Sequence, residues 1–129
     1  MGYPVYQHAV PEGRISEHGY SVAFARTPEE LRELQRLRFE VFNLELGEGL
    51  EESYATGLDE DRFDPVCHHL IVVHEESDSI VGTYRMQTSE MAAEYSGFYS
   101  ADEFTLDNLP EEVLTNAIEI GRALSLIHI

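Results

Sequence analysis

The segment from Thr27 to Leu46, TPEELRELQRLRFEVFNLEL, places the strongest constraint on how this chain folds. Thr27 is a typical N-cap residue, Pro28 suits the first helical position, and Glu30 stands three residues after the cap, where it can complete a capping box. These signals predict a helix that begins at Pro28. Apolar residues recur at helical spacing on one face, so we expect the helix to pack on a sheet or on another helix. That face consists of Leu31, Leu34, Leu37, Val41 and Phe42.

Strand patterns lie on both sides of this helix. Residues 20–25 alternate in the manner of a half-buried strand, and residues 68–75 and 79–88 predict an antiparallel hairpin with a polar turn. Gly47 and Gly49 end the helix, and a loop of about fifteen residues follows. Residues 89–114 form a short helical or irregular connection to a last strand within 116–129. The order predicts one α/β or α+β layered domain over residues 18–129, after an irregular lead-in over residues 1–17.

Charge and length exclude several classes of function. The 129 residues carry 25 acids and eight bases, for a net charge of −17, and every base is arginine. Such a surface repels phosphate backbones and anionic lipids, so nucleic-acid binding is not expected. No apolar run reaches the roughly 20 residues of a membrane span, and the first residues lack the layout of a signal peptide. With a single cysteine, Cys67, the chain is expected to be cytoplasmic.

Two arginines stand out against this acidic background. Arg38 lies one helical turn from both Leu34 and Phe42, in an otherwise apolar row, and Arg85 lies within a strand. A buried guanidinium needs a carboxylate, because an unpaired buried charge costs several kcal/mol. Asp61 and Asp64 are the nearest candidates. Three interpretations stay open: Arg38 reaches the solvent, the four residues form a structural ion-pair cluster, or they line a pocket for a charged, amino-acid-like substrate.

Other groups give weaker signals. The stretch DEDRFD lacks the glycine and the distant glutamate of a calcium loop, so an EF-hand is rejected. Cys67, His68, His69 and His74 have the side chains of zinc ligands, but neighbours on a strand point to opposite faces, and no metal site is expected. Cys67 is more simply a small buried residue. Glu119 is the one acid within the last strand, where it could have a raised pKa and act as a general base or could pair with an arginine.

Five motifs in a fixed order resemble one known family. They are LQRLRFEVFNLELG, DEDRFDPVCHHLIVV, IVGTYRMQ, GFYSADEFTL and IEIGRA, and the match as a whole covers about residues 18–123. The chain resembles the hemolysin-like N-acyltransferases of the GNAT superfamily, the group that includes the ornithine N-acyltransferases. It is more distantly similar to the acyl-homoserine-lactone synthases. The resemblance implies the N-terminal part of a GNAT-like domain, with a mixed, mainly antiparallel sheet and helices on its faces.

The resemblance also implies a reaction. An acyl group would move from a thioester on acyl carrier protein or coenzyme A to the amine of a small, ornithine-like amino acid, with no bound cofactor, in the cytoplasm or at the inner membrane. Carried over residue by residue, the substrate-binding residues would be Arg38, Asp61, Asp64 and Arg85, and the catalytic residues Glu119 and Arg122. Asp59 and Glu60 would then face water. The alternatives are a non-catalytic binding module of the same fold and an acyl-homoserine-lactone-type synthase.

The last residues depart from the family pattern. After Arg122 the family usually continues with a small residue or cysteine, a histidine and further basic residues, whereas this chain reads ALSLIHI. In GNAT folds the following loop holds the phosphates of the acyl donor at a helix N-terminus. We therefore expect a C-terminally truncated domain, with residues 124–129 of uncertain origin, that is the inactive acceptor-side half of an acyltransferase.

Overall fold

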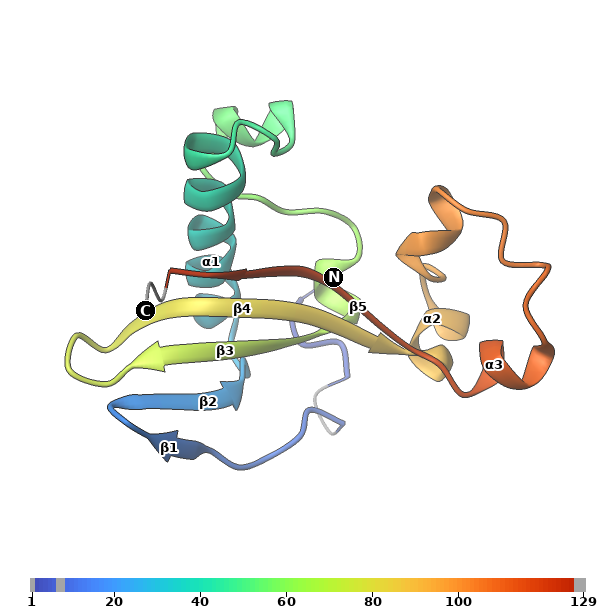
Figure 1. The fold of residues 1–129 in the computed structure, drawn as a ribbon, viewed down its shortest axis with the longest axis horizontal. Helices are drawn as coiled ribbons and strands as arrows, with labels where there is room; N and C mark the ends of the chain where they lie inside the picture. Colours follow the sequence, from blue (N-terminus) through green and yellow to red (C-terminus); the bar gives the residue numbers. More distant parts are fainter. Residues whose placement is uncertain (1, 7–8, 127–129) are drawn as a thin grey trace.

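Five strands form one sheet in which every neighbouring pair is antiparallel. The computed structural model describes residues 2–6 and 9–126, and the strands follow chain order from one edge to the other (Figure 1). The predicted layered α/β fold is confirmed, although no parallel pair occurs within the described residues. The strands are β1 Ile15–Glu17, β2 Tyr20–Phe24, β3 His68–His74, β4 Ser79–Thr88 and β5 Ile118–Ser125.

Helix α1, Pro28–Arg38, begins where the sequence predicts. The Thr27 hydroxyl accepts from the Glu30 backbone N–H at 3.1 Å, and the Glu30 carboxylate accepts from the Arg26 N–H at 3.0 Å. These bonds provide acceptors for the Glu30 N–H in the first helical turn and for the Arg26 N–H just before the N-cap. The helix continues into a π-helical segment, η1 Phe39–Glu45.

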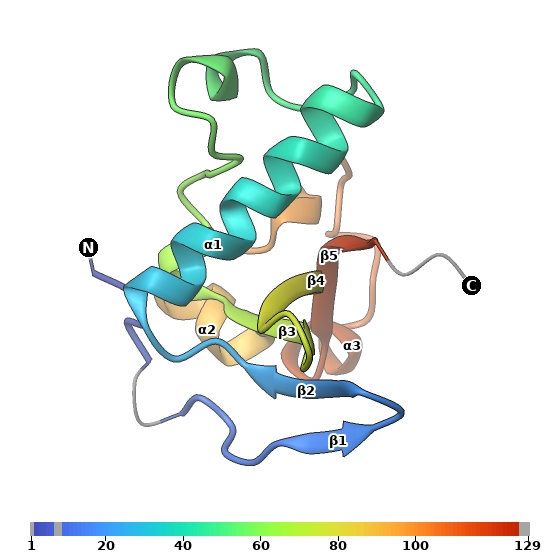
Figure 2. The same ribbon diagram turned by 90° about the vertical axis from the view of Figure 1, so that its left-hand side faces the viewer.

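The hydrophobic core lies between α1 and the sheet. Leu31, Leu34 and Leu37 pack with Ile71 of β3 and Ile80 of β4, and all five are buried. Figure 2 shows α1 crossing one face of the sheet. The predicted apolar face of the helix is confirmed.

A β-bulge in β4 decides which of its side chains face α1. Val73 pairs with Ile80 but Val72 pairs with Gly82, so Val81 is an extra residue in the strand. Because side chains alternate along a strand, one extra residue reverses the alternation beyond it. Ile80 and Arg85 therefore both face the helix, although they are five residues apart. Val81, the extra residue, is half-buried.

The first residues are more ordered than the predicted irregular lead-in. Strand β1 pairs with β2, with Ile15 opposite Val22. Tyr3 is buried, donates its hydroxyl hydrogen to the Ala25 carbonyl at 2.6 Å and packs edge-on against His69. The expectation of an irregular segment over residues 1–17 is therefore wrong for Ile15–Glu17, where pairing with β2 rather than an apolar pattern forms a strand.

The remaining helices are short and lie in the connections. Figure 1 shows α2 and α3 at the end of the sheet where β4 ends and β5 begins. Strand β5 completes the described sheet beside β4, and the last part of the predicted strand, residues 127–129, lies outside the described residues. No helix in the described part of the chain is both long and apolar enough to cross a membrane. The short helices are η2 Glu51–Ala55, η3 Asp64–Val66, α2 Ser89–Glu94, η4 Tyr99–Asp102 and α3 Glu111–Thr115.

Candidate active site

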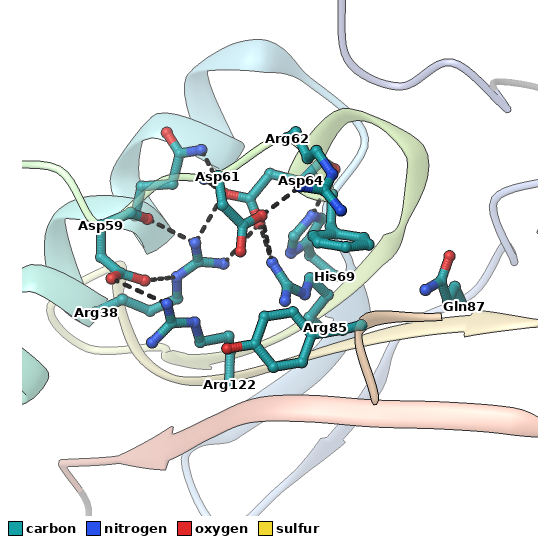
Figure 3. A network of polar contacts seen from close by, with 12 residues as sticks. Arg38, Asp59, Asp61, Arg62, Asp64, His69, Arg85, Gln87 and Arg122 are labelled. Atoms are coloured by element: carbon teal, nitrogen blue, oxygen red, sulfur yellow. Dashed lines mark hydrogen bonds and ion pairs between the residues drawn. The ribbon is translucent and has the colours of Figure 1, made fainter. Parts of the chain in front are cut away.

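Three aspartates from the loop before β3 meet the arginines of α1 and β4. The Arg38 guanidinium binds both Asp64 oxygens, at 3.0 and 2.7 Å, and the Asp59 carboxylate at 2.8 Å. Arg85 donates to Asp61 at 2.7 Å and to Asp64 at 3.0 Å. Figure 3 shows these side chains converging between the helix and the sheet. We call Arg38, Asp59, Asp61, Asp64 and Arg85 the ionic cluster.

Asp64 is the centre of the ionic cluster. It also accepts from the Gln35 amide at 2.9 Å, and its backbone carbonyl accepts from His69 Nε2 at 2.9 Å. Burial raises the pKa of Asp64, but Arg38 and Arg85 outweigh this effect and hold the pKa well below its usual range. Burial lowers the pKa of His69 to about 4, so the ring is neutral at pH 7. The centre of the cluster therefore holds a carboxylate in contact with two guanidinium groups.

The predicted convergence of Arg38 on Asp64, and of Arg85 on Asp61 and Asp64, is confirmed. Arg38 does not reach the solvent, because its side chain is 1% exposed. Hydrogen bonds to protein acceptors use four of its five N–H donors. Arg38 and Asp64 thus have little capacity left for a substrate, and their contacts are those of a structural clamp between loop and helix.

Asp59 corrects one expectation. We expected it to face water, but its side chain is fully buried and binds Arg38 Nε. Its backbone N–H donates to the Gln35 carbonyl at 3.0 Å, which turns the loop toward α1. Its second oxygen, Oδ1, lies 3.6 Å from Nη2 of Arg122 on β5. Asp59 therefore links the ionic cluster to the last strand, whereas Glu60 is exposed as expected.

Glu119 is held by four hydrogen bonds. Its Oε1 accepts from the Gln87 amide at 2.9 Å and the Tyr99 N–H at 2.8 Å, and its Oε2 accepts from the Ser100 N–H at 2.7 Å and hydroxyl at 2.5 Å. Burial raises the pKa of Glu119, but the hydrogen bonds from Ser100, Gln87 and Tyr99 outweigh it and leave the pKa below its ordinary value. The possibility of a raised pKa is thus wrong. Glu119 also has no arginine partner among the ion pairs of the described residues.

A pocket of about 130 Å³ opens beside β5. It places the Glu119 carboxylate near two guanidinium groups, those of Arg85 and Arg122, and we call it the Glu119 pocket. A primary amine entering it meets an ionised carboxylate. The lining residues that carry polar side chains are Cys67, Arg85, Gln87, Tyr99, Ser100, Glu119 and Arg122.

A second, more acidic hollow adjoins this pocket. It has a volume of about 350 Å³ and shares Tyr99 and Arg122 with the Glu119 pocket. We call it the acidic hollow. Its carboxylates are Glu52, Glu60, Asp61 and Asp102, and its guanidinium groups are those of Arg62 and Arg122.

Arg122 lies at a bulge in β5. Arg85 pairs with Gly121 and Thr83 with Leu124, so two residues of β5, Arg122 and Ala123, stand opposite one of β4. The backbone of Arg122 is in the left-handed region, with φ 51°, which arginine rarely adopts. Its guanidinium lies over the Phe42 ring, 5.3 Å from the centroid. The bulge thus turns the Arg122 side chain toward Phe42 of η1 and toward Asp59 (Figure 3).

The structure brings all six sequence-predicted site residues to one region, but in two groups. Arg38, Asp61, Asp64 and Arg85 belong to the ionic cluster, whereas Glu119 and Arg122 line the Glu119 pocket, which Arg85 also reaches. Sequence reasoning missed the residues that complete both groups. Gln87 could have been found from the strand pattern, because it lies two residues after Arg85 and therefore on the same face of β4. No such pattern exists for the residues in loops. The missed residues are Gln35, Asp59, His69, Gln87, Tyr99 and Ser100.

The cysteine and histidines have structural surroundings. Burial raises the pKa of Cys67 to about 12, so its thiol stays protonated at neutral pH. His68 packs on Phe24 whereas His69 contacts Asp64, which confirms that the two neighbours point to opposite faces. His74 bonds to the Ser77 hydroxyl at the hairpin. Within the described residues, no three His, Cys, Asp or Glu side chains are arranged to hold a metal ion.

The chain is similar to proteins of known classification. Residues 37–127 match the sequence profile of a family described as an acetyltransferase (GNAT) domain. An L-ornithine N(alpha)-acyltransferase of Brucella abortus is 37% identical over 122 residues, which cover 89% of this chain and 43% of that protein. Proteins of the same name are 36% identical over 81% of this chain in Rhodobacter capsulatus and 38% identical over 66% of it in Agrobacterium fabrum.

The chain spans about two fifths of the length of the first two of these relatives, 43% and 42%. It covers 31% of the Agrobacterium fabrum protein. No solved structure matches the chain at a significant level.

Proposed function

The chain belongs to the GNAT acetyltransferase domain family, and on that premise we propose that it serves in acyl transfer from a thioester to the amine of a small amino acid such as ornithine. The relatives named L-ornithine N(alpha)-acyltransferase support this choice of acceptor. The donor would be an acyl group on coenzyme A or on acyl carrier protein. Glu119 and Arg122 would act at the reacting groups, with Arg85 and Asp61 beside them and Arg38 and Asp64 as their scaffold.

The observation that carries this proposal is the Glu119 pocket, because it places a carboxylate and two guanidinium groups within the segment that matches the family. An amine and a thioester carbonyl must meet for transfer, and opposite charges there serve both partners. The four hydrogen bonds to the Glu119 carboxylate already fill its acceptor sites, so it would act on the amine through its charge, which attracts the amine and stabilises the positive charge that nitrogen gains on attack. A guanidinium stabilises negative charge on the carbonyl oxygen.

The proposed reaction needs no acyl-enzyme intermediate. The amine nitrogen attacks the thioester carbonyl, the new C–N bond forms, the C–S bond breaks, and the proton lost by nitrogen ends on the leaving thiolate. Cys67 lines the pocket but keeps its thiol protonated, so it is a poor nucleophile. Glu119 accepts four hydrogen bonds and has a lowered pKa, which suits an electrostatic role better than proton abstraction.

An apolar groove next to the pocket supports a donor with a hydrocarbon chain. The groove has a volume of about 250 Å³ and shares Ser100, Glu119 and Ile120 with the Glu119 pocket. Ile118 and Ile120 are more than half exposed there. Each methylene that a bound chain buries contributes about 0.8 kcal/mol. We therefore propose that the groove receives the chain of the acyl donor, and that donors longer than acetyl are preferred.

The experiment is an acylation assay of the purified protein with L-ornithine and a series of acyl thioesters on coenzyme A and on acyl carrier protein. Mass spectrometry of the products is expected to detect Nα-acyl ornithine, with a yield that rises with chain length, and such turnover would contradict the expectation from the sequence that the chain is an inactive acceptor-side half. Ile120→Ser should reduce the preference for long chains and leave short-chain transfer less affected.

Two outcomes would contradict the proposal. Binding of ornithine without any turnover would favour the non-catalytic binding module. Turnover with acetyl-coenzyme A alone would support acyl transfer but refute the role of the apolar groove.

A further inference from the structure

Arg122 is the least occupied arginine of the candidate site. Arg38 donates four hydrogen bonds and Arg85 donates two. Among the described residues, the Arg122 side chain has only the 3.6 Å ion pair with Asp59 and the contact with the Phe42 ring. A guanidinium carries five N–H donors, so most of those of Arg122 remain available.

The partner of Arg122 is unsatisfied as well. Asp59 Oδ1 is fully buried and has no hydrogen-bond partner within the described residues. Its 3.6 Å separation from Arg122 Nη2 is an ion pair but exceeds hydrogen-bond length. Buried polar atoms are nearly always paired, and an exception needs an explanation. Here Asp59 and Phe42 orient the guanidinium without occupying its donors.

Arg122 also lies at the boundary between two spaces. It lines both the Glu119 pocket and the acidic hollow. A ligand anion bound to Arg122 would therefore have a carboxylate, Glu119, on one side and the hollow's acids on the other. A molecule that fits carries one anionic group between two amines.

We propose that Arg122 binds the α-carboxylate of a diamino acid acceptor, so that the α-amine points into the Glu119 pocket and the distal ammonium lies in the acidic hollow near Glu52 and Glu60. This inference rests on the proposed function and deepens it, because it explains which of two amines is acylated. Arginine suits the task, since its planar fork binds a carboxylate through two parallel hydrogen bonds.

Charge favours a carboxylate over the phosphate of an acyl donor at this position. The acidic hollow contains four carboxylates and two guanidinium groups, and one of these, Arg62, is paired with Asp102 at 3.1 Å. A phosphate would bring further negative charge among these acids, and like charges repel. A diamino acid brings two ammonium groups with its one carboxylate, so its net positive charge complements the hollow.

The test compares three ligands that differ by one group: L-ornithine, 1,4-diaminobutane, which lacks the carboxylate, and L-norvaline, which lacks the distal amine. Titration of the purified protein, followed by calorimetry or NMR shifts, should give the tightest binding for ornithine. In Arg122→Gln, ornithine affinity should fall by about 10- to 100-fold, as expected for hydrogen bonds to a charged group, and 1,4-diaminobutane affinity should change little. The ornithine affinity of Arg122→Lys should lie between those of the wild type and Arg122→Gln, because lysine keeps the positive charge but lacks the planar guanidinium that donates two parallel hydrogen bonds.

Arg36→Gln is the matched control, because it removes the same charge from an exposed position on α1 and should leave all three affinities unchanged. Thermal unfolding would verify that each variant is folded. Suppose that the wild type binds ornithine, but that Arg122→Gln reduces the affinities for ornithine and 1,4-diaminobutane equally or changes neither affinity. The assignment of Arg122 to the carboxylate is then overturned, while the proposed function stands. If the wild type binds no ornithine, the assignment and the proposed function are both refuted. In Glu52→Gln with Glu60→Gln, a loss of ornithine affinity but not of norvaline affinity is expected, and an equal loss for both would refute the placement of the distal ammonium.

Discussion

The ionic cluster and the Glu119 pocket lie on the same face of the sheet, yet their charged groups are satisfied to very different degrees. In the ionic cluster, Arg38 and Asp64 are 1% exposed and bind each other through two hydrogen bonds. At the pocket, Arg122 is 17% exposed and has a single long ion pair. The two arginines share Asp59 as a partner, so the difference arises from their surroundings rather than from the type of side chain.

This difference separates the part of the molecule that stabilises the fold from the part that is available to bind a ligand. Within the described residues, every buried residue lies at or before Ala92, and β5 and α3 contain none. The cluster side is thus packed by α1, β3 and β4, whereas the pocket side depends on hydrogen bonds from the segment around Ser100. We expect mutations on the first side to change stability and mutations on the second side to change binding.

The largest expected effect is from Arg38→Ala. It would leave buried Asp64 with Arg85 as its only cation and buried Asp59 with only the long ion pair to Arg122. Breaking a buried ion pair in this way costs about 3 to 5 kcal/mol. The free energy of unfolding from urea denaturation should fall by that amount, and Arg36→Ala, on the exposed face of the same helix, should change it by under about 0.5 kcal/mol. A loss under about 1 kcal/mol for Arg38→Ala would show that the cluster does not support the fold.

Acid should weaken the cluster side in two steps. Burial lowers the pKa of His69 from 6.5 to about 4. Between these two pH values the unfolded chain binds a proton at His69 and the folded chain does not. The free energy of unfolding therefore falls as the pH decreases from 6.5 to about 4. The arginine partners of Asp64 lower its pKa in the folded chain. Asp64 therefore stabilises the fold above its unfolded pKa of about 4, and this stabilisation is lost as the pH falls below that value. Urea denaturation at a series of pH values measures both steps.

Burial lowers the pKa of His68 as well, so His68 contributes to the first step in the same direction. His69→Phe should therefore reduce the first step and keep the second, which separates His69 from Asp64. The result that would contradict this assignment is a His69→Phe variant whose stability still falls between pH 6.5 and pH 4 as steeply as that of the wild type.

Glu119→Gln tests the hydrogen bonds that order the Glu119 pocket. The neutral amide is a weaker acceptor than a carboxylate, so the bonds from Tyr99 and Ser100 weaken by about 1 kcal/mol or more. Hydrogen exchange at the Tyr99 and Ser100 amides should become about tenfold faster. Exchange at Ile71 in β3 should remain unchanged, and an equal acceleration there would mean that Glu119 stabilises the whole fold.

The smallest effect is expected for Arg62→Ala. The Arg62 and Asp102 side chains are 64% and 50% exposed, and exposed ion pairs contribute about 1 kcal/mol at most. The free energy of unfolding should therefore change by under about 1 kcal/mol, with a smaller change at high salt. A larger loss would show that the rim of the acidic hollow contributes to folding after all.

Sequence patterns were sufficient for the elements with a periodic signal. The capping box at Thr27 and Glu30, the apolar face of α1 and the β3–β4 hairpin all follow from local rules that hold without knowledge of the rest of the chain. The pairing of Arg38 with Asp64 followed from energetics, because a charge in an apolar row requires a partner.

The positions that sequence reasoning missed are set by distant contacts. Asp59 lies in a loop without periodicity, and its burial depends on Arg38 and on the Gln35 carbonyl, neither of which the local sequence indicates. The pKa of Glu119 depends on donors from Tyr99 and Ser100, about twenty residues away in the chain. A raised pKa is the correct expectation for burial alone, and it fails where hydrogen bonds outweigh desolvation.

The left-handed backbone of Arg122 implies a conflict between stability and function at one position. Non-glycine residues in this conformation cost about 1 kcal/mol or more, and glycine adopts it freely. Selection for thermal stability alone would therefore favour glycine at position 122, at the expense of the guanidinium. Laboratory evolution toward heat resistance, without a demand for ornithine binding, should reach this substitution early, whereas selection for acylation should exclude it.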